Sequence, residues 1–98
     1  MLVKIIKTYR DIVVICDANL IGKKFEQGKF QLDIKESFYK GEKTSEEQTI
    51  EIIKKMSTED AIFNIVGKKS INTALKTGII SEEGIKKIQE IPFALILM

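Results

Sequence analysis

The chain has 98 residues, 44% of them hydrophobic and 31% charged, and its 16 basic and 14 acidic side chains leave a formal net charge of +2. This composition is typical of a globular protein with a single core, and we expect one domain over residues 1–98. A single cysteine excludes an internal disulfide, and the absence of histidine removes the commonest general base and metal ligand. We therefore expect no cofactor, no metal site and no enzyme.

The hydropathy pattern argues against export and against a membrane. The apolar N-terminal stretch is interrupted by Lys4, Lys7 and Arg10, so no signal-peptide core forms. The longest apolar run, Phe93 to Met98, is far shorter than the ~20 residues that a membrane helix needs. The expected location is the cytoplasm.

Two strands are predicted first, from Leu2 to Ile6 and from Ile12 to Cys16. The short polar segment between them predicts a hairpin. The second strand is apolar throughout, so we expect it to be covered on both faces.

The next elements are a loop and a half-buried strand. The stretch from Leu20 to Gly28, with glycines at positions 22 and 28, predicts an ordered loop. Alternation then predicts a strand from Lys29 to Ile34 with Phe30, Leu32 and Ile34 on its buried face. An aromatic turn is expected at Phe38–Gly41.

A capping box marks the start of the first long helix. Ser45 and Gln48 have the spacing of that motif, and Ile50, Ile53 and Met56 supply the expected buried stripe. The apolar pattern then predicts a strand from Ala61 to Val66 and a helix from Lys68 to Thr77 that ends at Gly78. A short helix is expected to begin at Ser81, to carry Ile85 and Ile88, and to end at Pro92. The last predicted element is a strand from Phe93 to Met98.

These elements predict an α+β domain. We expect a small mixed or antiparallel sheet of about four to five strands with two to three helices packed on one side. The strand order and the oligomeric state do not follow from the pattern.

The order of these motifs resembles an archaeal family catalogued as domain of unknown function 424. The resemblance covers nearly the whole chain and is carried by Cys16-Asp17, Leu20 to Phe25 with Gly28, Leu32 to Ile34, Phe38 to Gly41, Asn64 to Gly67, Ala74 with Gly78 to Ile80, and Ile91-Pro92. It implies an archaeal source, a compact single domain and relatives encoded near translation genes, with no established activity. Members often carry histidine where this chain has Phe93, so no role of that histidine transfers.

The segment from Gly22 to Gly41 is the first candidate binding region, because lysines and aromatic residues alternate within it. Lys23, Lys24 and Lys40 are candidates for phosphate contact, and Phe25 or Tyr39 for base stacking. The alternative is that the aromatic rings anchor the loops to the core, with nearby glutamates offsetting the lysines.

A second candidate lies at Lys68 and Lys69, directly after Gly67. The unpaired N–H groups at the start of a helix can receive a phosphate. The alternative is an ordinary helix start with solvated lysines. A phosphate-binding loop is excluded because the glycine that this motif requires is replaced by Ile62.

The other constellations favour structural roles. Cys16 ends an apolar run and has no histidine to take its proton, so we expect a buried, inert thiol. The helix pair near Gly78 is not expected to read DNA, because its second helix begins Ser81-Glu82-Glu83, which repels phosphate. The paired carboxylates at helix starts complement the helix dipole.

The leading hypothesis is a non-catalytic binding module in archaeal information processing, associated with RNA or a ribonucleoprotein. The rival is a protein-interaction or assembly subunit that exposes the apolar segment Phe93–Met98. A third reading, a small enzyme using Asp17 and a lysine, requires a deep pocket in which both groups converge.

Overall fold

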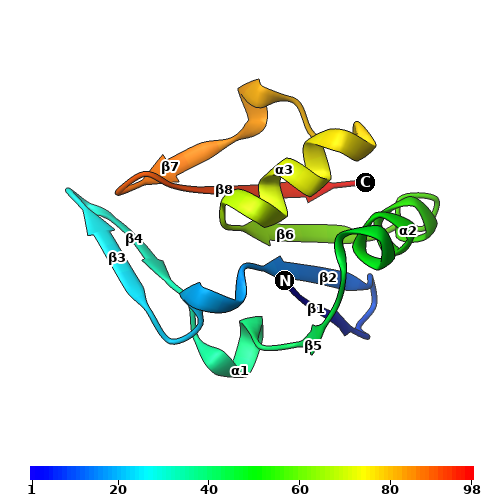
Figure 1. The fold of residues 1–98 in the computed structure, drawn as a ribbon, viewed down its shortest axis with the longest axis horizontal. Helices are drawn as coiled ribbons and strands as arrows, with labels where there is room; N and C mark the ends of the chain where they lie inside the picture. The colour runs from blue at the N-terminus through cyan, green and yellow to red at the C-terminus, as the bar shows by residue number, and fades with distance from the viewer.

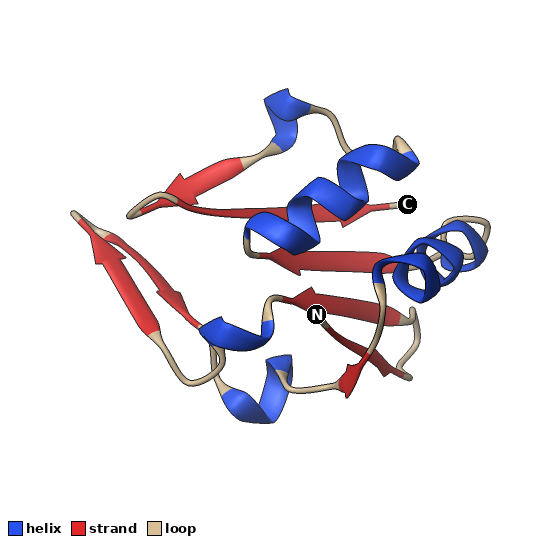
Figure 2. Ribbon diagram, in the orientation of Figure 1, coloured by secondary structure: helices blue, strands red, loops and turns tan.

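The protein, described over residues 1–98 by a computed structural model, is an α+β fold built on a six-stranded mixed sheet and a separate two-stranded hairpin (Figures 1 and 2). The sheet has the order β5-β1-β2-β6-β8-β7, and the hairpin pairs β3 with β4. The strands are β1 (Leu2–Ile6), β2 (Ile12–Cys16), β3 (Lys24–Gln27), β4 (Phe30–Asp33), β5 (Glu42–Lys43), β6 (Ile62–Val66), β7 (Lys86–Ile88) and β8 (Ile91–Leu97). The helices are α1 (Glu36–Tyr39), α2 (Glu46–Met56) and α3 (Lys68–Thr77), with 3₁₀ turns at Ala18–Leu20 and Glu82–Gly84.

The two central strands, β2 and β6, run parallel and are buried on both faces, as predicted for β2. Val13, Ile15 and Phe63 point to one face, which α2 and α3 cover and which we call the helix face. Val14 and Cys16 point to the opposite face, where the β3–β4 hairpin and α1 pack; we call this the hairpin face.

The helices therefore do not all lie on one side of the sheet, which corrects the prediction. The two long helices, α2 and α3, cover the helix face together (Figure 1). The short α1 packs on the hairpin face, because the aromatic segment predicted as a turn coils once and buries Tyr39 there. None of these helices has the length and apolar character needed to span a membrane.

The ends of the long helices follow their sequence signals. Ser45 and Gln48 form the predicted capping box, with the Gln48 N–H donating to Ser45 Oγ at 3.1 Å and the Ser45 N–H donating to Gln48 Oε1 at 3.2 Å. Gly78 ends α3 in the left-handed conformation, with φ of 78°. Within α2 the buried stripe contains Thr49 in place of the expected Ile50, which is only half-buried.

The hairpin β3–β4 replaces the predicted loop that ended at Gly28. Only Phe25 in β3 is apolar, so the strand carries no alternation; it forms because β4 supplies backbone partners and Gly28 turns the chain with φ of 61°. Leu32 and Ile34 are buried as predicted. Phe30 is not: it lies near the hairpin tip and is 72% exposed.

The hairpin β7–β8 replaces the predicted helix over Ser81 to Ile88. Its two-residue loop, Gln89 and Glu90, has positive φ at both positions, a conformation that usually requires glycine or asparagine. Tertiary hydrogen bonds hold it, since the Gln89 N–H donates to Gln27 Oε1 at 2.8 Å and Gln89 Nε2 donates to the Glu26 carbonyl at 2.6 Å. The structure contains eight strands, above the four to five predicted, because the sequence analysis did not predict β3, β5 and β7.

Part of the hairpin face remains uncovered at the far end from the hairpin. Ile6, Ile12, Ile62 and Leu97 stand in register across four neighbouring strands. Leu97 and its neighbour on the same face, Leu95, are each 65% exposed. This open apolar row contains part of the segment that the sequence marked for a protein partner.

Candidate anion-binding site

The carboxyl ends of β2 and β6 form the structural setting of the site. After β2 the chain turns towards the hairpin face, and after β6 it enters α3 on the helix face (Figure 1). A crevice opens where neighbouring parallel strands send their connections to opposite faces, and ligands of open α/β sheets bind at such points.

Asp17, the residue after β2, closes the start of α3. Its carboxylate, which is almost fully buried, accepts hydrogen bonds from the Lys69 N–H at 3.0 Å, from the Ser70 N–H at 2.8 Å and from the Ser70 hydroxyl at 2.7 Å. The Asp17 N–H donates in turn to the Val66 carbonyl at 3.1 Å. Asp17 thus caps a helix that begins about fifty residues later in the chain.

This arrangement corrects one part of the sequence reasoning. The expected phosphate-receiving N–H groups of Lys69 and Ser70 are already bonded to Asp17. Gly67 makes the contact possible, because a Cβ at that position would lie 2.3 Å from Asp17 Cγ. The start of α3 therefore offers only the Lys68 N–H, and we expect any anion at this end of the sheet to be held mainly by side chains.

Three lysines line the crevice beside this cap. Lys43, Lys68 and Lys69 border a cavity of about 620 Å³, and none of them has an ion-pair partner. We call this cavity the basic crevice; its other lining residues include Asp17, Asn19, Leu20 and Ile91. The only acid is Asp17, whose charge is already bound by three donors. The charges in the crevice that remain without a partner are therefore positive.

Lys43 is a site residue that the sequence analysis did not identify. Strand β5, only two residues long, brings it to the crevice by pairing Lys43 with Leu2, which pairs in turn with Cys16 at the end of β2. Such a short strand has no periodicity, so no local signal places Lys43 there.

The other predicted lysines lie outside the crevice. Lys24 is 3.7 Å from Glu26 and Lys40 is 3.2 Å from Glu36, so each has a carboxylate beside it. These exposed pairs hold weakly, but they offset the positive charge locally. Lys23 is exposed, without an ion pair, and does not line the crevice.

The aromatic candidates serve mainly as anchors. Tyr39 is buried, which raises the pKa of its hydroxyl, and its ring packs edge-on against Phe38 with centroids 5.0 Å apart. Phe25 packs half-buried against the core of the hairpin face. Tyr39 is therefore not available for base stacking, and Phe25 is exposed only in part. The exposed ring of this region is Phe30, which the sequence pattern placed inside.

Cys16 is buried completely, as predicted. Burial, and to a smaller extent the Asp17 charge, raises the pKa of its thiol to about 12. A thiol held so far from ionisation is a packing residue.

Comparisons with known proteins show which fold and which family this chain shares. A solved structure described as an uncharacterized conserved protein from Methanopyrus kandleri is 20% identical, with a TM-score of 0.87 over 97% of this chain and 88% of that chain. At this identity the likeness shows the fold alone. No curated protein matches the sequence. The model of a family described as "Protein of unknown function (DUF424)" matches residues 6–98, and the chain therefore belongs to the DUF424 family.

Proposed function

We propose that this protein is a non-catalytic binding module of archaeal information processing whose basic crevice holds phosphate groups of single-stranded RNA, alone or in a ribonucleoprotein. The observation that carries the proposal is the convergence of Lys43, Lys68 and Lys69 on one cavity without ion-pair partners. Unpaired lysines in a hollow are expected to attract a polyanion and to release its counterions on binding.

The residue types favour contact with the backbone. Lysine binds phosphate as a point charge and lacks the planar fork with which arginine reads guanine or clamps phosphate. The single arginine, Arg10, is engaged with Asp60 at 3.0 Å and with the Met98 carbonyl. A hollow of this size suits the backbone of a flexible single strand, which can bend into it, better than a rigid duplex.

Two features support a non-catalytic role. The sequence contains no histidine, and both Asp17 oxygens accept hydrogen bonds that hold α3. Asp17 is therefore committed to the fold rather than available to work with a neighbouring lysine, as the enzyme reading required.

The test is fluorescence anisotropy with a labelled single-stranded RNA at several salt concentrations. Each phosphate neutralised in a single strand contributes about −0.7 to the slope of log K against log salt, so three lysines predict a slope of roughly −2. Lys68→Gln is expected to bring the slope closer to zero by about 0.7. The matched control is Lys54→Gln, which removes another exposed charge, in the last turn of α2.

No binding at the lowest salt concentration would refute the proposal. An equal effect of Lys68→Gln and Lys54→Gln would refute the assignment to the basic crevice, because the binding would then follow overall charge.

A protein-interaction role is the second candidate, favoured by the exposure of Leu95 and Leu97 on the open apolar row. Partners of this kind would survive nuclease treatment, would be lost on Leu95→Glu and would be retained on Lys68→Gln. The opposite pattern, with partners lost after nuclease treatment, would favour RNA.

A further inference from the structure

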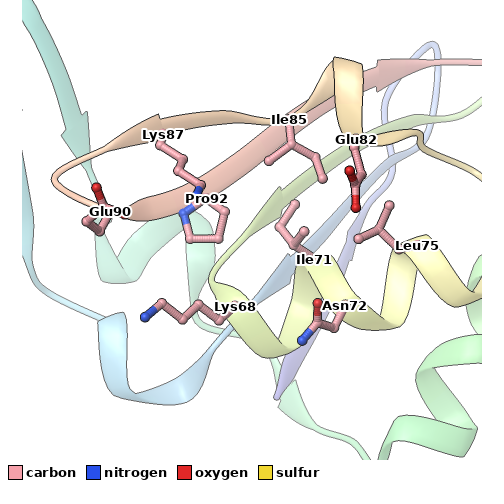
Figure 3. A pocket seen from close by; sticks show the side chains of 9 residues that line it. All are labelled: Lys68, Ile71, Asn72, Leu75, Glu82, Ile85, Lys87, Glu90 and Pro92. Atoms are coloured by element: carbon pink, nitrogen blue, oxygen red, sulfur yellow. The ribbon is translucent and has the colours of Figure 1, made fainter.

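A second cavity adjoins the basic crevice, between α3 and β7 (Figure 3). It has a volume of about 560 Å³, within the range of small-molecule sites. Lys68 lines both cavities, whereas Ile91 and Pro92, which face opposite sides of β8, line one cavity each. A ligand bound at Lys68 in the crevice can therefore extend into this second hollow, which we call the α3–β7 cavity.

Four aliphatic side chains form one part of the lining of the α3–β7 cavity, and the other five lining residues are polar or charged. Ile71 and Pro92 are buried, and Leu75 and Ile85 are half-buried beside them. Figure 3 shows these side chains approaching one another from α3 and from the β7 side. Apolar walls of this kind can enclose a flat, unstacked base.

Hydrogen-bonding groups stand at the edges of this apolar surface. Glu82 lies at one end beside Leu75 and Ile85, Lys68 lies at the other end, and Asn72 projects from α3 between them (Figure 3). Glu82 and Asn72 make no side-chain hydrogen bond or ion pair within the protein. Lys87 and Glu90, on the β7 side, have opposite charges and add no net charge.

The order of these groups specifies the ligand chemistry. Reading from Lys68 to Glu82, the cavity offers a cation, aliphatic walls and then a carboxylate that only accepts hydrogen bonds. A nucleotide presents a phosphate, a flat base and a hydrogen-bonding edge in the same order. Among the four bases, guanine alone has two adjacent donors, N1–H and N2–H₂, on its Watson–Crick edge, where the two oxygens of a carboxylate can accept them together.

We propose that the α3–β7 cavity receives one unstacked guanine of the RNA whose phosphate lies at Lys68, with Glu82 accepting from the guanine edge. This inference rests on the proposed function and adds base selectivity to it. Asn72 offers an amide donor for a base or sugar oxygen.

The experiment is competition between labelled single-stranded RNA and 5′-GMP, 5′-AMP, 5′-CMP, 5′-UMP or inorganic phosphate. A two-point contact with a base edge predicts that GMP competes about tenfold better than the other nucleotides. Glu82→Gln should abolish this preference, because an amide presents one donor and one acceptor, and should leave competition by inorganic phosphate unchanged. The matched control is Glu83→Gln, in the same 3₁₀ turn but outside the cavity, which should keep the preference.

The outcomes separate the two proposals. Equal competition by all nucleotides, together with salt-dependent RNA binding, would overturn the guanine assignment and leave the proposed function standing. A preference for GMP that survives Glu82→Gln would also overturn it. Absence of RNA binding at low salt would overturn the proposed function and, with it, the guanine assignment that rests on it.

Discussion

Removal of the Asp17 carboxylate should destabilise the protein severely. In Asp17→Ala the Lys69 N–H, the Ser70 N–H and the Ser70 hydroxyl lose their acceptor in a buried setting. A hydrogen bond to a charged group contributes about 1.5–3 kcal/mol, and a carboxylate at a helix start adds up to about 2 kcal/mol. Since water will satisfy part of this loss, we expect the free energy of unfolding to fall by roughly 3–5 kcal/mol, a large share of the 5–15 kcal/mol typical of a domain.

The assay is urea unfolding followed by circular dichroism, with the melting temperature as a second readout. A loss of this size lowers Tm by about 4–8 °C for each kcal/mol in a domain of this length. Asp17→Asn, which keeps one oxygen acceptor, should lose less and remain measurable if the alanine variant does not fold. The control is Asp60→Ala, which breaks an exposed ion pair and should cost no more than about 1 kcal/mol. A loss below about 1 kcal/mol for Asp17→Ala would refute the capping role.

Three further substitutions test neighbouring features. Gly67→Ala should be much more destabilising than Gly22→Ala: both positions have positive φ, but only at Gly67 does the new Cβ collide with another group, Asp17; equal losses would contradict this. The thiol pKa of Cys16 is raised from 9.0 to about 12, so its contribution to stability is complete below pH 9 and declines by up to about 1.4 kcal/mol per pH unit as the pH rises towards 12. In Cys16→Ala the free energy of unfolding should therefore depend less on pH between 9 and 12. An unchanged pH dependence would contradict the buried, protonated thiol. Ser45→Ala removes half of the capping box and should cost about 1 kcal/mol in urea unfolding, whereas no change would contradict the cap.

Local signals were enough for the parts of the fold that carry strong patterns. The continuous apolar run of β2, the mostly apolar β6, the Ser45 capping box and the glycine at position 78 each act within a few residues, and the structure agrees with them. These elements form the centre of the sheet and its helix face.

The elements that escaped prediction depend on partners far away in the chain. Strand β3 exists because β4 pairs with it, and the β7–β8 loop keeps its positive φ angles because Gln27 and Glu26 bind Gln89 across 62 and 63 residues. Phe30 follows the alternation of a buried strand, but the hairpin tip carries it into solvent. No local pattern contains this information.

The candidate site could be predicted only in part from the sequence, for the same reason. Lys68 and Lys69 were identified from their place at a helix start, although the expected helix N–H groups are bonded to Asp17. Lys43 reaches the crevice through strand pairing, and Asp17 reaches α3 across 52 to 53 residues. The sequence analysis considered Asp17 only for an enzyme, and the packed structure shows instead that it caps α3.

The most direct measurement is the map of backbone amide shifts in ¹⁵N-labelled protein titrated with single-stranded RNA. The account predicts that the largest shifts fall on residues 17–20, 43 and 67–72, which line or support the basic crevice. Largest shifts along the open apolar row of Ile12, Ile62 and Leu95, or no shifts at low salt, would contradict it.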